Sequence, residues 1–219
     1  MNIYHQLEGP ILDVLERHYR AHNHVLGLSK PALDKGAYWE LKRRHESVGR
    51  ICALSGCPKA DRFHYEQNWR RFIEERKFLS CDHLVPGARD TLQASAQHHQ
   101  LVLLALRQNP ENLDWQLDFL GLKPYLVKVL YADSGQTPSW WLEEELILKS
   151  GIFRGERGLM VVNTEDDMVA GRHLRLTTVA VLNGLRDRER LSYAEPDFYL
   201  DDITQLPPFI SQVVSGAHH

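Results

Sequence analysis

The sequence of 219 residues contains little cysteine and no apolar run of membrane-spanning length. Its three cysteines, Cys52, Cys57 and Cys81, cannot all pair with one another, and their spacing differs from that of a zinc knuckle, so we expect reduced thiols. A transmembrane helix needs about 20 consecutive apolar residues. The N-terminus also lacks the basic region and long apolar stretch of a secretory signal. These absences predict a cytoplasmic protein without a membrane partner.

An excess of basic charge is also absent, since 26 Lys and Arg residues stand against 29 Asp and Glu residues. Surfaces that bind nucleic acid are usually basic, so no nucleic-acid partner is expected. The 43% of hydrophobic and 25% of charged residues are typical of a globular protein, and the length suits one domain with an insertion. Twelve histidines is a high count, but the last two, His218 and His219, have the form of a tag remnant.

Two regions of the chain differ in their hydrophobic pattern. Between about Val14 and Leu84 the spacing of apolar residues predicts helices only, around residues 15–20, 38–44 and 65–74. From residue 85 onward, short apolar strands alternate with helices. The predicted strands are 101–105, 125–130, 159–162 and 177–181, and the predicted helices are 110–120, 139–149 and 165–174.

A further strand, residues 2–6, precedes the helical region. The pattern therefore predicts an α/β fold, with a three-layer, Rossmann-like parallel sheet as its core. The core would comprise residues 1–13 and 85–219, and an all-helical cap of residues 14–84 would be inserted after the first strand. Ser139 is a plausible N-cap for the helix 139–149.

Ligands of such folds bind in a crevice beyond the carboxyl ends of the strands. The strand ends predict that one crevice, covered by the cap, gathers the following polar and backbone groups: Gln6, Glu8, Gly9, Arg107, Asn163 and Asp167. An arginine at this place would suit an anion.

Residues 6–13, Gln-Leu-Glu-Gly-Pro-Ile-Leu-Asp, resemble the opening motif of the haloacid dehalogenase-like (HAD) phosphatases, Asp-x-Asp-Gly-Thr-Leu. Further matches follow in order at residues 85–88, 105–107, 162–171 and 180–186, and then at Pro196 and Asp197. Each match alone is weak, but their order and spacing cover nearly the whole chain. The resemblance implies a HAD-like core with a small helical cap.

The same resemblance implies a definite chemistry. An aspartate attacks phosphorus, a second aspartate protonates the leaving group, and a hydroxyl and a lysine hold the phosphoryl oxygens. Acidic groups of the last motif bind Mg²⁺.

This chain departs from that pattern at most positions. The vestigial catalytic positions are Gln6 for the nucleophile, Glu8 for the acid, Ala105 for the hydroxyl, Glu143 for the lysine, and Asn163 and Asp167 for the metal-binding acids. Lys128 and Lys149 are only loose substitutes for the lysine, whereas Glu8 could still carry a proton.

These departures predict that phosphate esters are not hydrolysed through an aspartyl-phosphate. We expect no cofactor, or Mg²⁺ bound at most weakly through Glu8, Asp166 and Asp167. The first hypothesis is a non-catalytic, pseudophosphatase-like protein that binds an unknown protein partner or a small ligand. The alternative is a HAD-family hydrolase with weak or altered, Mg²⁺-dependent activity.

Two histidines, His18 and His22, lie one helical turn apart, a spacing that can bind zinc. No neighbouring acid or cysteine completes such a site, so the pattern favours a solvent-exposed helix face.

Overall fold

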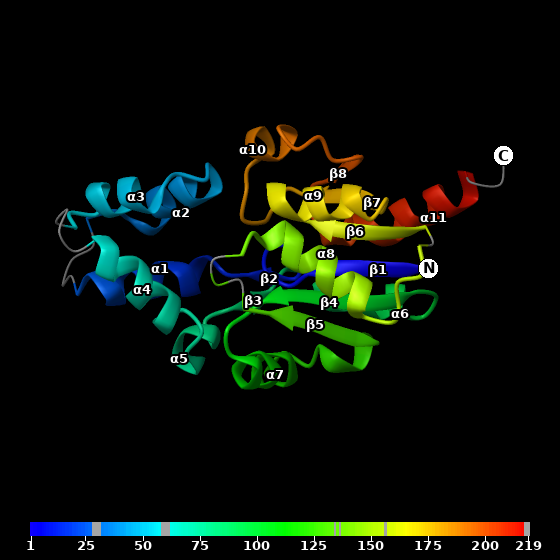
Figure 1. Ribbon diagram of the computed structural model, residues 1–219, viewed down its shortest axis with the longest axis horizontal. Helices are drawn as coiled ribbons and strands as arrows, with labels where there is room; N and C mark the ends of the chain where they lie inside the picture. The colour runs from blue at the N-terminus through cyan, green and yellow to red at the C-terminus, as the bar shows by residue number, and fades with distance from the viewer. Residues whose placement is uncertain (28–31, 58–61, 134, 136, 156, 217–219) are drawn as a thin grey trace.

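Six parallel strands form the central sheet of the computed structural model, which describes residues 1–27, 32–57, 62–133, 135, 137–155 and 157–216 (Figure 1). The strand order is β5-β4-β1-β6-β7-β8. The strands are β1 (Asn2–Gln6), β4 (Gln100–Leu106), β5 (Lys128–Ala132), β6 (Gly158–Val162), β7 (Thr177–Val181) and β8 (Phe198–Leu200). The first strand along the chain thus lies in the middle of the sheet, with β4 and β6 on its two sides.

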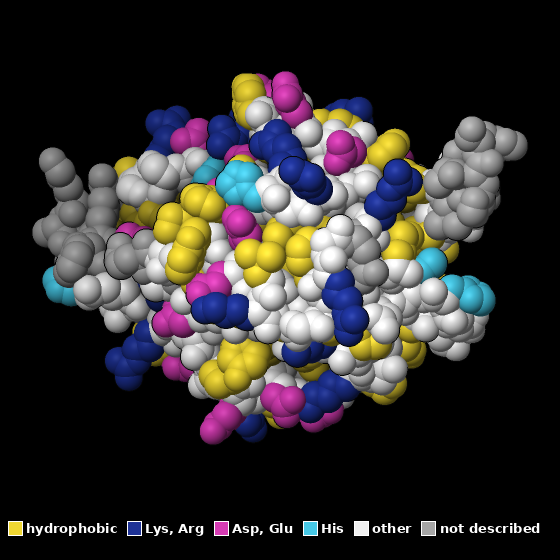
Figure 2. Space-filling model, turned by 45° about the vertical axis from the view of Figure 1, so that its right-hand side comes forward, with side chains coloured by type: hydrophobic (Ala, Val, Ile, Leu, Met, Phe, Trp, Pro, Cys, Tyr) yellow, Lys and Arg dark blue, Asp and Glu magenta, His cyan; other side chains and the backbone are white. Residues whose placement is uncertain are grey.

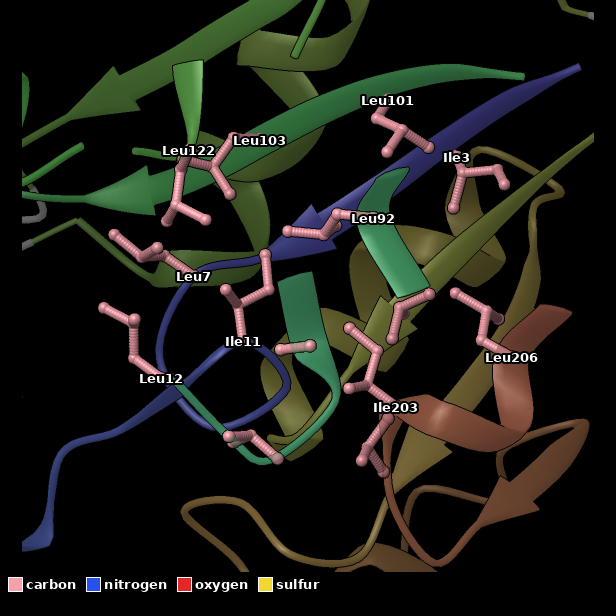
Figure 3. Close-up of a cluster of buried hydrophobic side chains, with 14 of the residues drawn as sticks. Ile3, Leu7, Ile11, Leu12, Leu92, Leu101, Leu103, Leu122, Ile203 and Leu206 are labelled. Atoms are coloured by element: carbon pink, nitrogen blue, oxygen red, sulfur yellow. The ribbon is translucent and has the colours of Figure 1, made fainter. Parts of the chain in front are cut away.

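Helices cover both faces of the sheet. Apolar side chains of α6 (Ala88–Ala96), α7 (Pro110–Phe119) and α11 (Leu206–Gly216) pack on one face, in a buried cluster that contains Ile3, Leu92 and Leu206 (Figure 3). On the other face, Tyr4 packs with residues of α8 (Ser139–Lys149), α9 (Glu165–His173) and α10 (Arg188–Ser192). Successive side chains of a strand point to opposite faces, so β1 contributes to both clusters. The prediction of a three-layer α/β fold is confirmed.

The helical region lies beyond the carboxyl ends of the strands, on the left of Figure 1. It consists of α1 (Leu15–Leu26), α2 (Lys35–Arg43), α3 (Val48–Leu54), α4 (Arg62–Phe72) and α5 (Arg76–Leu79). Where the chain enters and leaves this region, β2 (Leu12–Asp13) and β3 (His83–Leu84) pair in antiparallel fashion. The division into a core of 1–13 and 85–219 and a cap of 14–84 stays a prediction, and we propose this two-stranded ribbon as its boundary.

Two local predictions in the core are wrong. The strand expected at residues 125–130 begins only at Lys128, because residues Lys123–Tyr125, with Pro124 in the middle, form a 3₁₀ turn first. Ser139 does not cap α8, whose N-cap is Pro138; the Ser139 hydroxyl donates a hydrogen bond to the Asp166 carboxylate instead.

The expectation of a solvent-exposed His18 and His22 is also wrong, since both side chains are buried in the cap. The ring nitrogens of His22 lie 2.7 Å from the Tyr65 hydroxyl and 2.8 Å from the Ser55 hydroxyl. Burial lowers the pKa of each histidine to about 4, so both rings are neutral near pH 7. The inward face of α1 therefore carries these histidines.

The three cysteines are buried, and none of them forms a disulfide bond. Within the described ranges, none of the helices combines the length and apolarity needed to cross a membrane.

Candidate functional site

A cavity of ≈ 160 Å³ opens where β1, β4 and β6 end, on the side of the sheet that faces the cap. The parallel strands bring residues that are distant in the sequence to this one edge. Its lining includes all of the vestigial positions inferred from the sequence, namely Gln6, Glu8, Ala105, Glu143, Asn163 and Asp167. Arg107 also lines it, as the sequence predicts.

Gln6 and Glu143 form a direct contact at the base of the cavity. The Gln6 side-chain amide donates a hydrogen bond of 2.6 Å to Glu143 Oε1, and both side chains are buried. The Glu143 carboxyl lines the same cavity as the Asp167 carboxyl, and its Oε2 has no hydrogen-bond partner among the described residues. The amide at the nucleophile position is thus engaged with a side chain of α8.

The Glu143 and Asp167 carboxyls are both buried in this cavity, an arrangement that disfavours a negative charge on both. Burial, and then the neighbouring charge of Asp167, hold the pKa of Glu143 well above its usual range. Burial also raises the pKa of Asp167, although hydrogen bonds from Thr164 and Asn163 oppose that effect. Because Asp167 Oδ2 accepts from the backbone N–H groups of Asn163 (3.1 Å) and Thr164 (2.9 Å), we assign the negative charge to Asp167 and the proton to Glu143.

The side-chain amide of Asn163 forms hydrogen bonds to two loops of the core, one that contains Glu8 and one that contains Leu185. Its Nδ2 donates to the Glu8 carbonyl (2.7 Å), and its Oδ1 accepts from the Leu185 backbone N–H (3.0 Å). Gly9 makes this approach possible, since a Cβ there would lie 2.5 Å from Asn163 Oδ1, and its φ of +95° suits glycine. Gly9 therefore allows the Asn163 side chain to pack against this loop. It does not line the cavity, contrary to the expectation from the sequence.

The Glu8 carboxylate is held by two buried arginines. Its Oε1 lies 2.6 Å from Arg17 Nη2 of the cap and 2.7 Å from Arg107 Nη2 at the end of β4. The Arg107 and Arg17 charges outweigh the effect of burial and hold the pKa of Glu8 well below its usual range. The interpretation of Glu8 as a group that carries a proton is therefore wrong.

The arginines continue into a wider network. Arg17 Nε donates to Asp82 Oδ1 (3.0 Å), and Gln116 Nε2 donates to Asp82 Oδ2 (2.7 Å). Arg107 Nη2 also donates to Gln116 Oε1 (3.2 Å). Gln116 and Asp82 thus connect the two arginines a second time, in addition to Glu8. Sequence reasoning missed Arg17, Asp82 and Gln116, because nothing in their spacing marks them as partners.

The residues present do not fit a magnesium ion. The described part of the chain holds no cluster of three or more His, Cys, Asp or Glu side chains with the geometry of a metal site. Of the three weak candidates, Glu8 is paired with arginines, Asp166 accepts from Ser139 on the outside, and Asp167 accepts from backbone N–H groups. Mg²⁺ requires several free hard oxygens in octahedral arrangement.

Neither substitute lysine reaches the cavity. Lys128 Nζ donates to the Ser150 carbonyl, and Lys149 forms an ion pair with Glu145 on the surface of α8. A phosphoryl group at the base of the cavity would therefore meet Glu143 where the resemblance implies a lysine.

Solved structures with a similar fold include a hydrolase and a predicted phosphatase. A haloacid dehalogenase-like hydrolase from Streptococcus pneumoniae superposes with a TM-score of 0.76 at 15% identity, covering 95% of this chain and 97% of that chain. The chain has the haloacid dehalogenase-like fold. A predicted phosphoglycolate phosphatase from Haemophilus somnus 129PT shares this HAD-like fold, with a TM-score of 0.71, 16% identity, and coverage of 95% of this chain and 96% of that chain.

In sequence, the HAD-like chain is 27% identical over 131 residues to a phosphoglycolate phosphatase of Vibrio vulnificus strain YJ016. That match covers 57% of this chain and 55% of the relative, so it spans only about half of either protein. No family model matches the chain. The likeness of fold thus extends over nearly the whole chain, whereas the likeness of sequence is partial.

Proposed function

We propose that this HAD-like protein is non-catalytic and acts by binding a protein partner or a small ligand. The observation that carries the proposal is that two key positions of the crevice already have partners within the protein. The Gln6 amide donates to Glu143, and the Asp167 carboxylate accepts from two backbone N–H groups. The nucleophile position and the remaining acid of the metal position are therefore both engaged.

The charge of the crevice supports the same proposal. Asp167, whose carboxylate accepts from two backbone N–H groups, holds a negative charge in the crevice, and Arg107 is already paired with Glu8. A phosphate dianion placed here would face a carboxylate without a lysine or a metal ion between them. Two like charges about 4 Å apart repel by about 4 kcal/mol at an effective dielectric constant of 20.

The alternative is weak or altered hydrolysis of phosphate esters with Mg²⁺. It draws support from the partial sequence match to a phosphoglycolate phosphatase and from the presence of Asp167 in the cavity. The two functions differ in what the crevice binds, since the alternative requires Mg²⁺ and phosphate to bind cooperatively at the strand ends.

Calorimetric titration with Mg²⁺ and with inorganic phosphate separates the two. We expect neither to bind the wild-type protein at millimolar concentration, alone or together. A matched variant, Gln6→Asp combined with Glu143→Lys, restores a carboxylate and a cation to the two positions and should gain affinity for both. Binding of both ions to the wild type, each tightening the other, would support the hydrolase instead.

The location and the class of partner stay predictions. A cytoplasmic location is proposed from the sequence. In the view of Figure 2, acidic and basic side chains are interspersed over the surface, which supports a partner other than nucleic acid.

A further inference from the structure

The cap contains a second cavity, which lies between α2, α3 and α4 and shares no lining residue with the crevice. Its volume is ≈ 80 Å³. Aromatic and aliphatic side chains form most of its wall, namely Tyr38, Val48, Ile51, Tyr65 and Trp69. Lys42 also lines it, with Nζ 5.0 Å from the centre of the Trp69 ring. An ammonium group thus lies at an otherwise largely apolar cavity.

Lys42 is half-buried, and no carboxylate in the described parts of the chain forms an ion pair with it. Its contact with the Trp69 ring compensates only part of the cost of removing a charge from water. Burial, and then the charge of Arg186, lower the pKa of Lys42 to about 8. The cavity therefore holds a cation that an added anion would stabilise.

The other charged and titratable groups around Lys42 do not supply that anion. Glu8 attracts Lys42 but is itself paired with two arginines. His18 and His22 are neutral near pH 7, since burial lowers the pKa of each to about 4.

Four further groups line the cavity itself: Tyr38, Tyr65, Glu66 and Arg70. Burial raises the pKa of Tyr38 and of Tyr65, so neither phenol supplies an anion near neutral pH. Glu66, at the cavity edge, is exposed to solvent, and Arg70 there adds a second positive charge, with its guanidinium donating to the Gly135 carbonyl.

We propose that this cap cavity binds a small monocarboxylate, with Lys42 as the counter-ion and the aromatic wall around its apolar body. A carboxylate supplies the missing negative charge, whereas a cation would be repelled and a polyol would leave the apolar wall unmatched. The volume limits the body of the ligand. A cavity of about 150 Å³ holds the six carbon atoms of a benzene ring. The ≈ 80 Å³ here therefore suits an apolar body of about three or four carbon atoms, such as an isobutyl group.

Calorimetric titration of the full chain with isovalerate tests the proposal. We expect binding at pH 7, weaker binding of acetate, and none of isovaleramide, which has the same shape without the charge. Because the Lys42 pKa is about 8, the affinity should fall by about 30-fold between pH 7 and pH 9.5, as the amine loses its proton.

Variants of the full chain identify the residue. Lys42→Met should abolish isovalerate binding, Lys42→Arg should retain part of it, and Lys77→Met, at an exposed lysine of the same cap, should leave it unchanged. Thermal unfolding checks that Lys42→Met is folded, as expected when an unpaired, half-buried charge is removed. The proposal is overturned by an absence of isovalerate binding at 10 mM, by equal binding to Lys42→Met, or by equal binding of isovaleramide. The crevice variant Gln6→Asp with Glu143→Lys should bind isovalerate normally, so the outcome is independent of that site.

Discussion

The Glu8 side chain is one methylene longer than the aspartate that the resemblance implies, and it forms ion pairs with Arg17 and Arg107. The two arginines are 1% and 4% exposed, so they depend on this carboxylate for their charge balance. Glu8 therefore has a structural role at the junction of cap and core.

Glu8→Gln should destabilise the protein by about 3 kcal/mol, because it leaves two buried guanidinium groups with only Asp82 and Gln116 as partners. Urea unfolding at pH 7 measures the change. The matched control is Glu16→Gln, since Glu16 pairs with Arg20 and Lys35 on the surface, and its loss should cost less than about 1 kcal/mol. Equal effects of the two substitutions would contradict a special role of Glu8.

Glu143 provides a second test at the level of one residue. Its raised pKa means that the folded state keeps a proton that the unfolded state releases above about pH 4.5. Stability should therefore fall as the pH rises above that value, by up to about 1.4 kcal/mol per pH unit for one proton.

Glu143→Gln should remove this dependence, because the amide does not titrate and can still accept from Gln6. Urea unfolding of both proteins at pH 5.5 and pH 8 gives the comparison, in which contributions from the buried histidines cancel. We expect the variant to gain stability relative to the wild type at pH 8. A constant difference between the two proteins would show that Glu143 is ionised in the folded state.

Among the elements, α4 joins the cap to the core through Glu74, two residues beyond its C-terminus. The Glu74 carboxylate accepts from the backbone N–H groups of Gln108 and Asn109 at 2.9–3.0 Å, and its carbonyl accepts from Asn112. On the far side, Arg43 of α2 donates to the Leu182 carbonyl at 2.8 Å. The cap is thus held against the core at both ends of the crevice.

Glu74→Ala should release the first of these attachments. We expect hydrogen exchange of the Gln108 and Asn109 amides to accelerate by about tenfold or more, since each loses its charged acceptor. Glu75→Ala is the control, because Glu75 forms an ion pair only with Lys77 among the contacts described. Unchanged protection of Gln108 and Asn109 would mean that other contacts hold the cap closed.

The sequence predicts elements best where burial is uniform. The strands at 101–105, 159–162 and 177–181 are apolar throughout because the sheet is covered on both faces, and each lies where expected. The i, i+4 spacing of His18 and His22 identifies a helix but cannot tell its buried face from its exposed face. The 3₁₀ turn around Pro124 moves the start of the next strand to Lys128, which a hydrophobic pattern alone does not predict.

For the molecule as a whole, the sequence order of strands predicts which residues gather at the crevice, since parallel strands end at one edge. It does not predict which hydrogen bonds and ion pairs those residues form with one another. The pairing of Gln6 with Glu143 joins residues that are 137 positions apart, and the Glu8 network draws Arg17 from the cap. Such contacts depend on packing, which sets the distances between side chains.

The central claim is that this HAD-like fold carries no aspartyl-phosphate chemistry, and hydrolysis of an aryl phosphate with Mg²⁺ tests it most directly. Wild type and Asp167→Asn, purified in parallel, should show the same rate as buffer, with and without Mg²⁺. Turnover by the wild type that requires Mg²⁺ and is lost in Asp167→Asn would contradict the account.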